Sequence, residues 1–133
     1  MEVTVRLIGE LEVRCAAGVL GVRGFGGVKP RQIFEILVLN RGQSVSKERL
    51  ADLLWHGSPP ADHIATLESY VSTVRSRLEP AGQRRDSVIV TGNGSYLVDA
   101  DRVVTDVDRF VALVQRCTSE EPGHALETLR TAL

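Results

Sequence analysis

Small side chains, most of them hydroxyls, occupy one side of the stretch TLESYVSTVRSRLEP, residues 66–80. At the 100° per residue of a helix, the apolar residues form a single stripe. The opposite side and its flanks carry Ala65, Thr66, Ser69, Ser72, Thr73 and Ser76. Because Ser and Thr are mediocre helix formers, a face that meets only solvent would favour Lys, Glu and Gln. Small hydroxyl side chains let a helix approach a partner closely and offer donors and acceptors to phosphates and base edges. The pattern therefore favours nucleic-acid contact over a plain exposed face.

Positive charge gathers around this stretch. Residues 23–85 hold ten Lys and Arg against six Asp and Glu, a balance of +4, whereas the whole chain has a net charge of −1. Arg75 and Arg77 border the hydroxyl face, and fourteen of the sixteen basic residues are arginine, whose planar guanidinium suits phosphates and base edges. A basic middle between acidic ends predicts an anionic partner for the middle. A chance scatter of solvated charges would give the same balance. The charge therefore supports nucleic-acid contact only together with the hydroxyl face.

The elements that must position this face follow in a definite order. Alternating apolar residues in VTVRLIGELEVRC, and the glycines after them, predict a small antiparallel sheet up to about residue 27. KPRQIFEILVLNRG predicts a helix with Pro30 in its first turn and Gly42 as its C-terminal cap. SVSKERLADLLW predicts a second helix, capped by Ser46. After HGSPPAD, Asp62 is expected to cap a third helix, residues 62–79, which Pro80 ends.

A hairpin and further helices are expected next. SVIVTGNGSYLV, residues 87–98, holds two β-rich runs around a Gly-Asn-Gly turn. Sheet, three helices and hairpin wing are the order of a winged helix-turn-helix, an α+β fold whose third helix and wing dock on DNA. Thr105 and Asp108 match a capping box, and residues 125–133 repeat a helical pattern. We therefore expect a winged-helix domain over residues 1–101, followed over residues 102–133 by the first helices of a truncated all-α domain.

Four stretches in this order resemble the DNA-binding region of the SARP-type regulators, the antibiotic regulatory proteins of actinobacteria. They are KPRQIFEILVLNRGQSVSKERLADLLW, TLESYVSTVRSRLEP, SVIVTGNGSYLV and TDVDRFVALV. That family carries an OmpR-like winged helix followed by a TPR-like bacterial transcriptional activator domain. The resemblance implies a sequence-specific duplex DNA-binding regulator of transcription that acts as an activator, although the sequence by itself does not separate activation from repression.

The resemblance also implies which residues meet which partner. The third helix would lie in the major groove, the hairpin would meet the adjacent minor groove or backbone, and protomers would sit side by side on direct repeats. The loop of residues 56–62 would touch RNA polymerase or its sigma factor. The candidates for DNA contact are Thr66, Ser69, Tyr70, Ser72, Thr73, Arg75 and Arg77 on the third helix, Asn93 and Gly94 at the wing tip, and Lys29, Arg31 and Arg49 for phosphates.

The chain departs from the family in its wing. Ser95-Tyr96-Leu97 stands where many members have Gly-Tyr-Arg, so the arginine that would enter the minor groove is missing. We expect weak binding by a single protomer, offset by tandem binding or by a partner.

Other functions find little support. His56 and His63 match no zinc-ligand spacing, and GVRGFGGVKP lacks the Gly-Lys-Ser/Thr of a phosphate-binding loop, so no enzyme, cofactor or metal is expected. Two distant cysteines, no run long enough to cross a membrane and no export signal at the start indicate a cytoplasmic protein. The open alternative is a winged-helix module that binds a protein and has little or no DNA affinity. Duplex binding that falls steeply with salt would separate the two classes.

Overall fold

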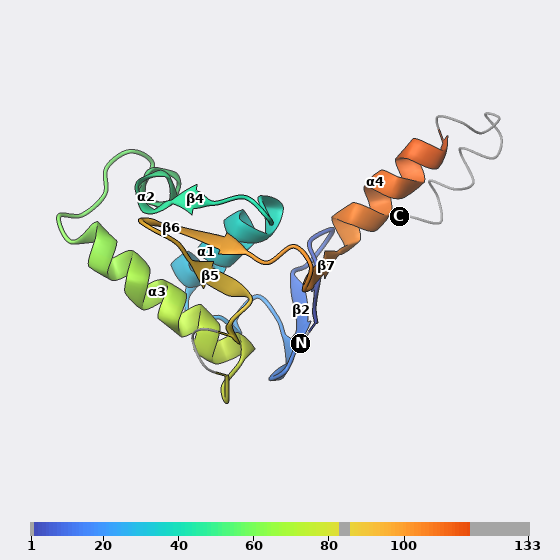
Figure 1. Ribbon diagram of the computed structural model, residues 1–133, viewed down its shortest axis with the longest axis horizontal. Helices are drawn as coiled ribbons and strands as arrows, with labels where there is room; N and C mark the ends of the chain where they lie inside the picture. Colours follow the sequence, from blue (N-terminus) through green and yellow to red (C-terminus); the bar gives the residue numbers. More distant parts are fainter. Residues whose placement is uncertain (1, 83–85, 118–133) are drawn as a thin grey trace.

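An N-terminal sheet comes first along the chain in the computed structural model, which describes residues 2–82 and 86–117 (Figure 1). Its strands are β1 (Val3–Arg6), β2 (Glu12–Cys15), β3 (Gly18–Leu20) and β7 (Val103–Thr105), in the order β3-β2-β1-β7. Strands β1, β2 and β3 pair antiparallel, as predicted. Every second residue of β1 is buried, which agrees with the alternating apolar residues of the sequence. β7 joins parallel to β1 from far along the chain. Such a long-range pairing leaves no local signal in the sequence.

All three predicted helices are present. They are α1 (Val28–Leu39), α2 (Lys47–Trp55) and α3 (His63–Leu78). Pro30 lies in the first turn of α1, as predicted, where its missing N–H costs nothing. The predicted cap of α2 is confirmed, because the Ser46 Oγ accepts the backbone N–H of Arg49 at 3.0 Å.

One predicted cap is wrong, and another has the predicted position without a side-chain hydrogen bond. The cap of α1 is Asn40, whose side-chain amide donates to the Ile36 carbonyl at 2.8 Å, and not Gly42. Gly42 lies further on with φ 80° and donates its N–H to the Val98 carbonyl, so it joins α1 to the wing. Asp62 is the N-cap residue of α3, as predicted, but its side chain makes no cap hydrogen bond. Its backbone, at φ −101° and ψ 29°, is outside the extended region from which a capping side chain reaches the helix.

The wing is a hairpin of β5 (Ile89–Thr91) and β6 (Ser95–Val98), inside the range predicted for it. The turn between them includes Gly94 at φ 70°, a conformation that glycine adopts without strain. A third strand, β4 (Val45–Ser46), pairs with β6, which gives a second sheet in the order β4-β6-β5. With only two residues, β4 is too short to show a period.

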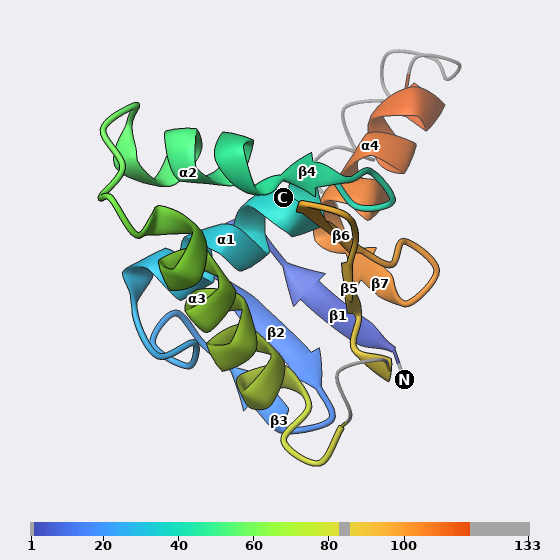
Figure 2. The same ribbon diagram turned by 60° about the vertical axis from the view of Figure 1, so that its left-hand side comes forward.

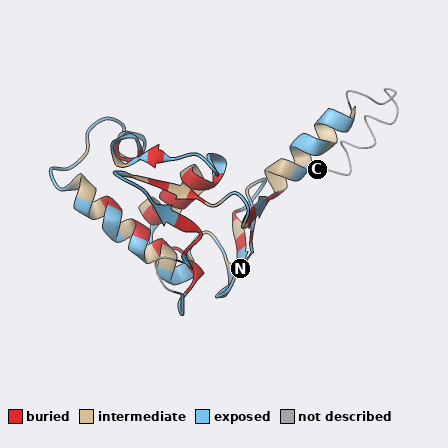
Figure 3. Ribbon diagram, viewed as in Figure 1, coloured by how far each residue is buried: buried red, intermediate tan, exposed pale blue. Residues whose placement is uncertain are grey.

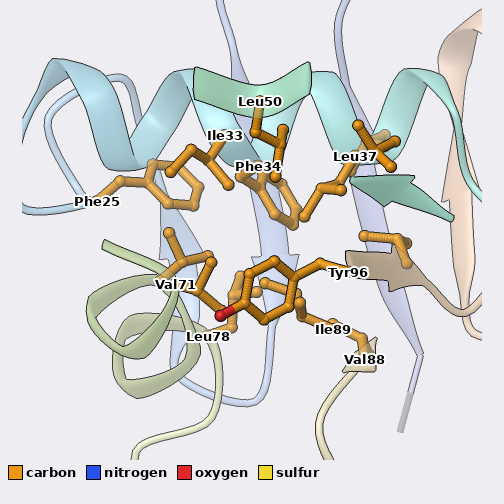
Figure 4. Packing of buried hydrophobic residues seen from close by; sticks show 14 of the residues in the cluster. Phe25, Ile33, Phe34, Leu37, Leu50, Val71, Leu78, Val88, Ile89 and Tyr96 are labelled. Atoms are coloured by element: carbon orange, nitrogen blue, oxygen red, sulfur yellow. The ribbon is translucent and has the colours of Figure 1, made fainter. Parts of the chain in front are cut away.

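One apolar core joins both sheets to the three helices. Its fully buried members come from β1, β2, all three helices, the wing and the loop that holds Phe25, and Phe25 stacks on Phe34 with ring centroids 5.3 Å apart. Phe34 of α1 and Tyr96 of β6 lie in the same cluster (Figure 4). The wing therefore belongs to the packed body of the domain, and its tip alone projects.

Helix α4 (Asp106–Cys117) begins directly after β7 and projects away from α3 (Figures 1 and 2). The predicted capping box is confirmed: the Thr105 Oγ1 accepts the Asp108 N–H, and the Asp108 carboxylate accepts the Thr105 N–H, both at 3.2 Å. Asp108 also forms an ion pair with Arg41. The carboxylate of Asp106 accepts the N–H groups of Leu7 and Ile8 at 2.8 and 3.0 Å.

The division of the chain into two domains stays a prediction. Strand β7, at residues 103–105, pairs with the N-terminal sheet although it follows the expected boundary at residue 101. The helical pattern of residues 125–133 lies outside the described residues.

Candidate nucleic-acid interface

Helix α3 turns one face to the core and the other to solvent (Figure 3). Its buried residues are Leu67, Val71, Val74 and Leu78. On the outer side, Ser69, Ser72 and Ser76 are exposed and form what we call the serine stripe. The apolar and hydroxyl sides of the helix are therefore where the sequence predicts them.

The hydroxyls beside and within the stripe differ in their hydrogen bonds. Thr66 and Thr73 are half-buried and donate to the carbonyls of Asp62 and Ser69, both at 3.1 Å. Ser76 donates to the Thr73 carbonyl at 2.9 Å. In the described part of the chain, the hydroxyls of Ser69 and Ser72 have no hydrogen-bond partner. These two serines offer both donor and acceptor to a molecule that approaches α3.

The wing supports one flank of α3. The guanidinium of Arg75 donates from Nε and Nη2 to the Ile89 carbonyl at 3.2 and 2.6 Å, and from Nη2 to the Thr91 Oγ1 at 2.7 Å. Its carbon Cζ lies 5.8 Å from the centre of the Tyr96 ring. A groove of about 300 Å³ runs between this flank and the wing, lined by Glu68, Ser72, Arg75, Ser76, Glu79 and Ser87 among others.

The start of α1 and the end of α2 support the other flank. Tyr70 stacks on Trp55 with ring centroids 6.4 Å apart. Lys29 donates from Nζ to the Leu54 carbonyl at 3.0 Å and lies 5.5 Å from the centre of the Trp55 ring. The loop before α1 approaches α3 so closely that a Cβ on Gly26 would meet the Thr73 Cγ2 at 2.8 Å. A second groove, of about 400 Å³, lies between these segments and Ser69.

Comparison with known proteins identifies this arrangement. The family model described as "Transcriptional regulatory protein, C terminal" matches residues 27–97, which include all three helices and most of the wing. The regulatory protein DnrI of Streptomyces peucetius is 39% identical over 115 residues, 79% of this chain and 42% of DnrI. The transcriptional regulatory protein MoaR1 of Mycobacterium tuberculosis is 35% identical over 98 residues, 70% of this chain and 32% of MoaR1. The chain belongs to the SARP-type family of OmpR-like regulators.

A solved structure agrees with the fold of this SARP-type chain. Mycobacterium tuberculosis EmbR, in complex with a low-affinity phosphopeptide, has a TM-score of 0.76 and 25% identity over 98% of this chain and 34% of EmbR. The chain spans less than half the length of each of these relatives. MoaR1 is named as a transcriptional regulatory protein and DnrI as a regulatory protein, and the family is not enzymatic, as the sequence predicts. Within residues 2–82 and 86–117, no cluster of His, Cys, Asp or Glu could hold a metal ion, and no helix has the length and apolarity to cross a bilayer.

The SARP-type structure gives the remaining predicted residues different surroundings. Arg77 is exposed on α3, and Arg49 is exposed on α2. Arg31 pairs with Glu35 on α1 at 3.0 Å. Asn93 and Gly94 are exposed at the wing tip. That these residues contact DNA stays a prediction, and so does the same prediction for Lys29, Tyr70 and Arg75, each of which has a partner inside the protein.

Sequence reasoning missed the residues that hold α3 in place. Lys47 donates to Glu68 at 3.0 Å and lies 5.3 Å from the centre of the Tyr96 ring, so it ties the start of α2 to α3 and the wing. Thr91 accepts from Arg75 at the end of β5. The alternation of β6 predicts that Tyr96 faces inward. The contacts of Lys47 with Glu68 and of Arg75 with Thr91 depend on how the helices and the wing pack, and no local sequence pattern predicts that packing.

Replacing Lys29 with Met should lower the free energy of unfolding by about 1 kcal/mol, because the variant loses a charged donor to the end of α2 and a cation–π contact with Trp55. Urea denaturation measures the change. Arg31→Met is the matched control, since it breaks only an i,i+4 pair and should cost roughly 0.3–0.5 kcal/mol. Equal losses in the two variants would mean that Lys29 does not hold α2.

Proposed function

We propose that this domain binds duplex DNA sequence-specifically, with α3 in the major groove and the β5–β6 hairpin as the wing. The observation that carries the proposal is the serine stripe: small hydroxyl side chains, exposed along a helix that is braced on both flanks. A braced helix with short side chains can enter a groove closely, and hydroxyls can bond to phosphates or to base edges. Membership of a family of transcriptional regulators supports this use of the face.

Charged residues around the stripe would supply affinity. Arg77 on α3 and Arg49 on α2 are exposed, and counterion release at phosphates provides much of the binding free energy of such domains. Asn93 and Gly94 would meet the adjacent minor groove or backbone from the wing tip. The wing tip, residues 92–94, carries no charged side chain, so we expect modest affinity for one half-site and tighter binding by protomers side by side on direct repeats.

Activation of transcription would use a different surface. The loop of residues 56–62 is exposed at all but one position and joins α2 to α3, so a polymerase or sigma factor could reach it beside bound DNA. The activity is proposed to take place in the cytoplasm.

Selection of bound duplexes from a random pool tests the proposal, followed by titration of the enriched duplex at two salt concentrations. We expect an enriched motif whose affinity falls steeply with salt, in proportion to the number of phosphate contacts. A folded chain that enriches no duplex would contradict the proposal and favour a winged-helix module that binds a protein.

Ser72→Glu should weaken binding to the enriched duplex by at least about tenfold, because it sets a longer, negatively charged side chain against the phosphates. The matched control is Thr4→Glu, which makes the same charge change at an exposed position of β1, in the N-terminal sheet and outside the three helices and the wing. Titration by fluorescence anisotropy measures both variants, and urea denaturation verifies that Ser72→Glu remains folded. If Ser72→Glu and Thr4→Glu bind alike, α3 does not enter the groove.

A further inference from the structure

Arg75 lies on the DNA-facing half of α3 by sequence, yet its guanidinium points to the wing. Three hydrogen bonds run from it to β5, two to the Ile89 carbonyl and one to the Thr91 hydroxyl. The Tyr96 ring, itself buried, lies beside the same guanidinium. One side chain therefore contacts both strands of the hairpin.

These bonds occupy Nε and Nη2, and Nη2 belongs to both edges through which a guanidinium can read guanine. A bidentate contact to guanine needs two parallel N–H donors aimed at two acceptors on the base. In Arg75, Nε and Nη2 are both aimed at Ile89, and Nη2 is shared with Thr91. Arg75 could give such a contact to DNA only by releasing the wing.

Arg77 has the opposite surroundings. It is exposed two residues further along α3, on the flank that faces the loop around Gly26. A guanidinium there can turn to a phosphate or a base while the wing stays attached. The two arginines of TVRSRLEP thus differ in what they can do, although the sequence presents them alike.

The position of Thr91 shows which part of the wing Arg75 holds in place. It is the last residue of β5, and the turn with Asn93 and Gly94 follows directly. A hydrogen bond at this point fixes the place from which the wing tip projects relative to α3. The distance between the wing tip and the serine stripe then decides whether both can meet one duplex at once.

We propose that Arg75 is a positioning residue, which ties the wing to α3 so that both meet the same duplex, and that Arg77 is the arginine of α3 that contacts DNA. This inference rests on the proposed function. It predicts that loss of Arg75 weakens DNA binding through the wing and leaves the number of ionic contacts unchanged.

The test compares Arg75→Ala, Arg75→Lys and Arg77→Ala on the enriched duplex. Arg75→Ala should bind about tenfold more weakly with an unchanged salt slope, because the wing tip is uncharged. Arg77→Ala should lower the slope by about one. Arg75→Lys keeps the charge and loses the planar fork, so it should not restore affinity. On a duplex shortened at the wing side, Arg75→Ala should bind as wild type does, whereas general destabilisation of the domain would weaken binding to both duplexes.

Hydrogen exchange without DNA gives an independent measure. Amides of residues 89–98 should exchange at least about tenfold faster in Arg75→Ala than in wild type, and at the wild-type rate in Arg77→Ala. Thr91→Val, which removes the acceptor hydroxyl at nearly constant shape, should weaken DNA binding in the same direction, and its effect should not add to that of Arg75→Ala. Thr91→Val also serves as the milder variant if Arg75→Ala does not fold.

Two results would overturn the inference: a salt slope lowered by about one in Arg75→Ala with unchanged wing exchange, or full recovery of affinity in Arg75→Lys. Either would make Arg75 a direct ionic contact. A wild-type chain that binds no duplex would overturn the proposed function, and with it the DNA contact of Arg77. Because exchange is measured without DNA, it would still report whether Arg75 holds the wing, which distinguishes the two failures.

Discussion

Gly26→Ala is expected to lower the free energy of unfolding by about 3 kcal/mol. Gly26 has φ 81°, a left-handed conformation that costs a residue with a Cβ about 1 kcal/mol or more. The added Cβ would also meet the Thr73 Cγ2 at 2.8 Å, and the overlap should cost roughly another 1–3 kcal/mol as α3 and the loop separate. Urea denaturation measures the total.

Two further variants separate these terms. Gly57 has φ 84° and an open surrounding within 4 Å of a Cβ, so Gly57→Ala should show only the conformational cost, about 1 kcal/mol. Thr73→Ser removes the Cγ2 that the new Cβ would strike, so in the Gly26→Ala background it should recover part of the loss. Equal costs for the two glycine variants would show that the close approach of the loop to α3 is not tightly packed.

Arg102→Ala is expected to be comparably severe, with a loss of about 3 kcal/mol. Arg102 forms an ion pair at 3.3 Å with Glu79, whose side chain is 7% exposed, and it donates to the Asp86 carbonyl at 2.8 Å. Removal of one partner from a buried pair leaves a charge without compensation, which typically costs 3–5 kcal/mol when burial is complete. The end of α3, the segment before the wing and the residue before β7 would all lose a shared contact.

Glu79→Gln in the Arg102→Ala background tests that cause. If the unpaired carboxylate is responsible, the neutral amide should restore a large part of the stability in urea denaturation. Arg6→Ala is the control for an exposed ion pair. The Arg6 Nη1 lies 3.4 Å from the Glu12 Oε2, and the two side chains are 52% and 29% exposed. This variant should lower the free energy of unfolding by no more than about 0.5 kcal/mol. Loss of stability without rescue would place the cause in the other contacts of Arg102, among them the hydrogen bond to Asp86.

Local patterns in the sequence predicted most of the fold. Period-two residues gave β1 and β2, period-3.6 residues gave the three helices, and Ser46 and Thr105 were recognised as caps, because each of these signals lies within a few residues of the chain. Asp62 takes the predicted N-cap position without a side-chain hydrogen bond, because that bond needs an extended backbone as well as the right side chain. The partners of β4 and β7 depend on segments distant in the sequence, which no window of a few residues includes.

The candidate interface also has a part that local sequence predicts and a part that depends on tertiary packing. Helical geometry alone places the serine stripe outside, so its exposure follows from sequence. Lys29, Tyr70 and Arg75 have residue types suited to DNA, but they lie on the flanks of α1 and α3, where neighbouring elements reach them first. Which flank a neighbour covers is decided by the tertiary packing, so the sequence could not separate bracing residues from exposed ones.

The join between β7 and α4 determines how a mechanical signal would travel through the molecule. Thr105 ends the strand and caps the helix, so no linker residue lies between them. Asp106 accepts hydrogen bonds from Leu7 and Ile8, which follow β1, and Asp108 forms an ion pair with Arg41 after α1. A force that rotates α4 would therefore also rotate the N-terminal sheet and α1, because these contacts leave no flexible linker between them. A rotation of α4 would then change the orientation of the rest of the domain, α3 and the wing included.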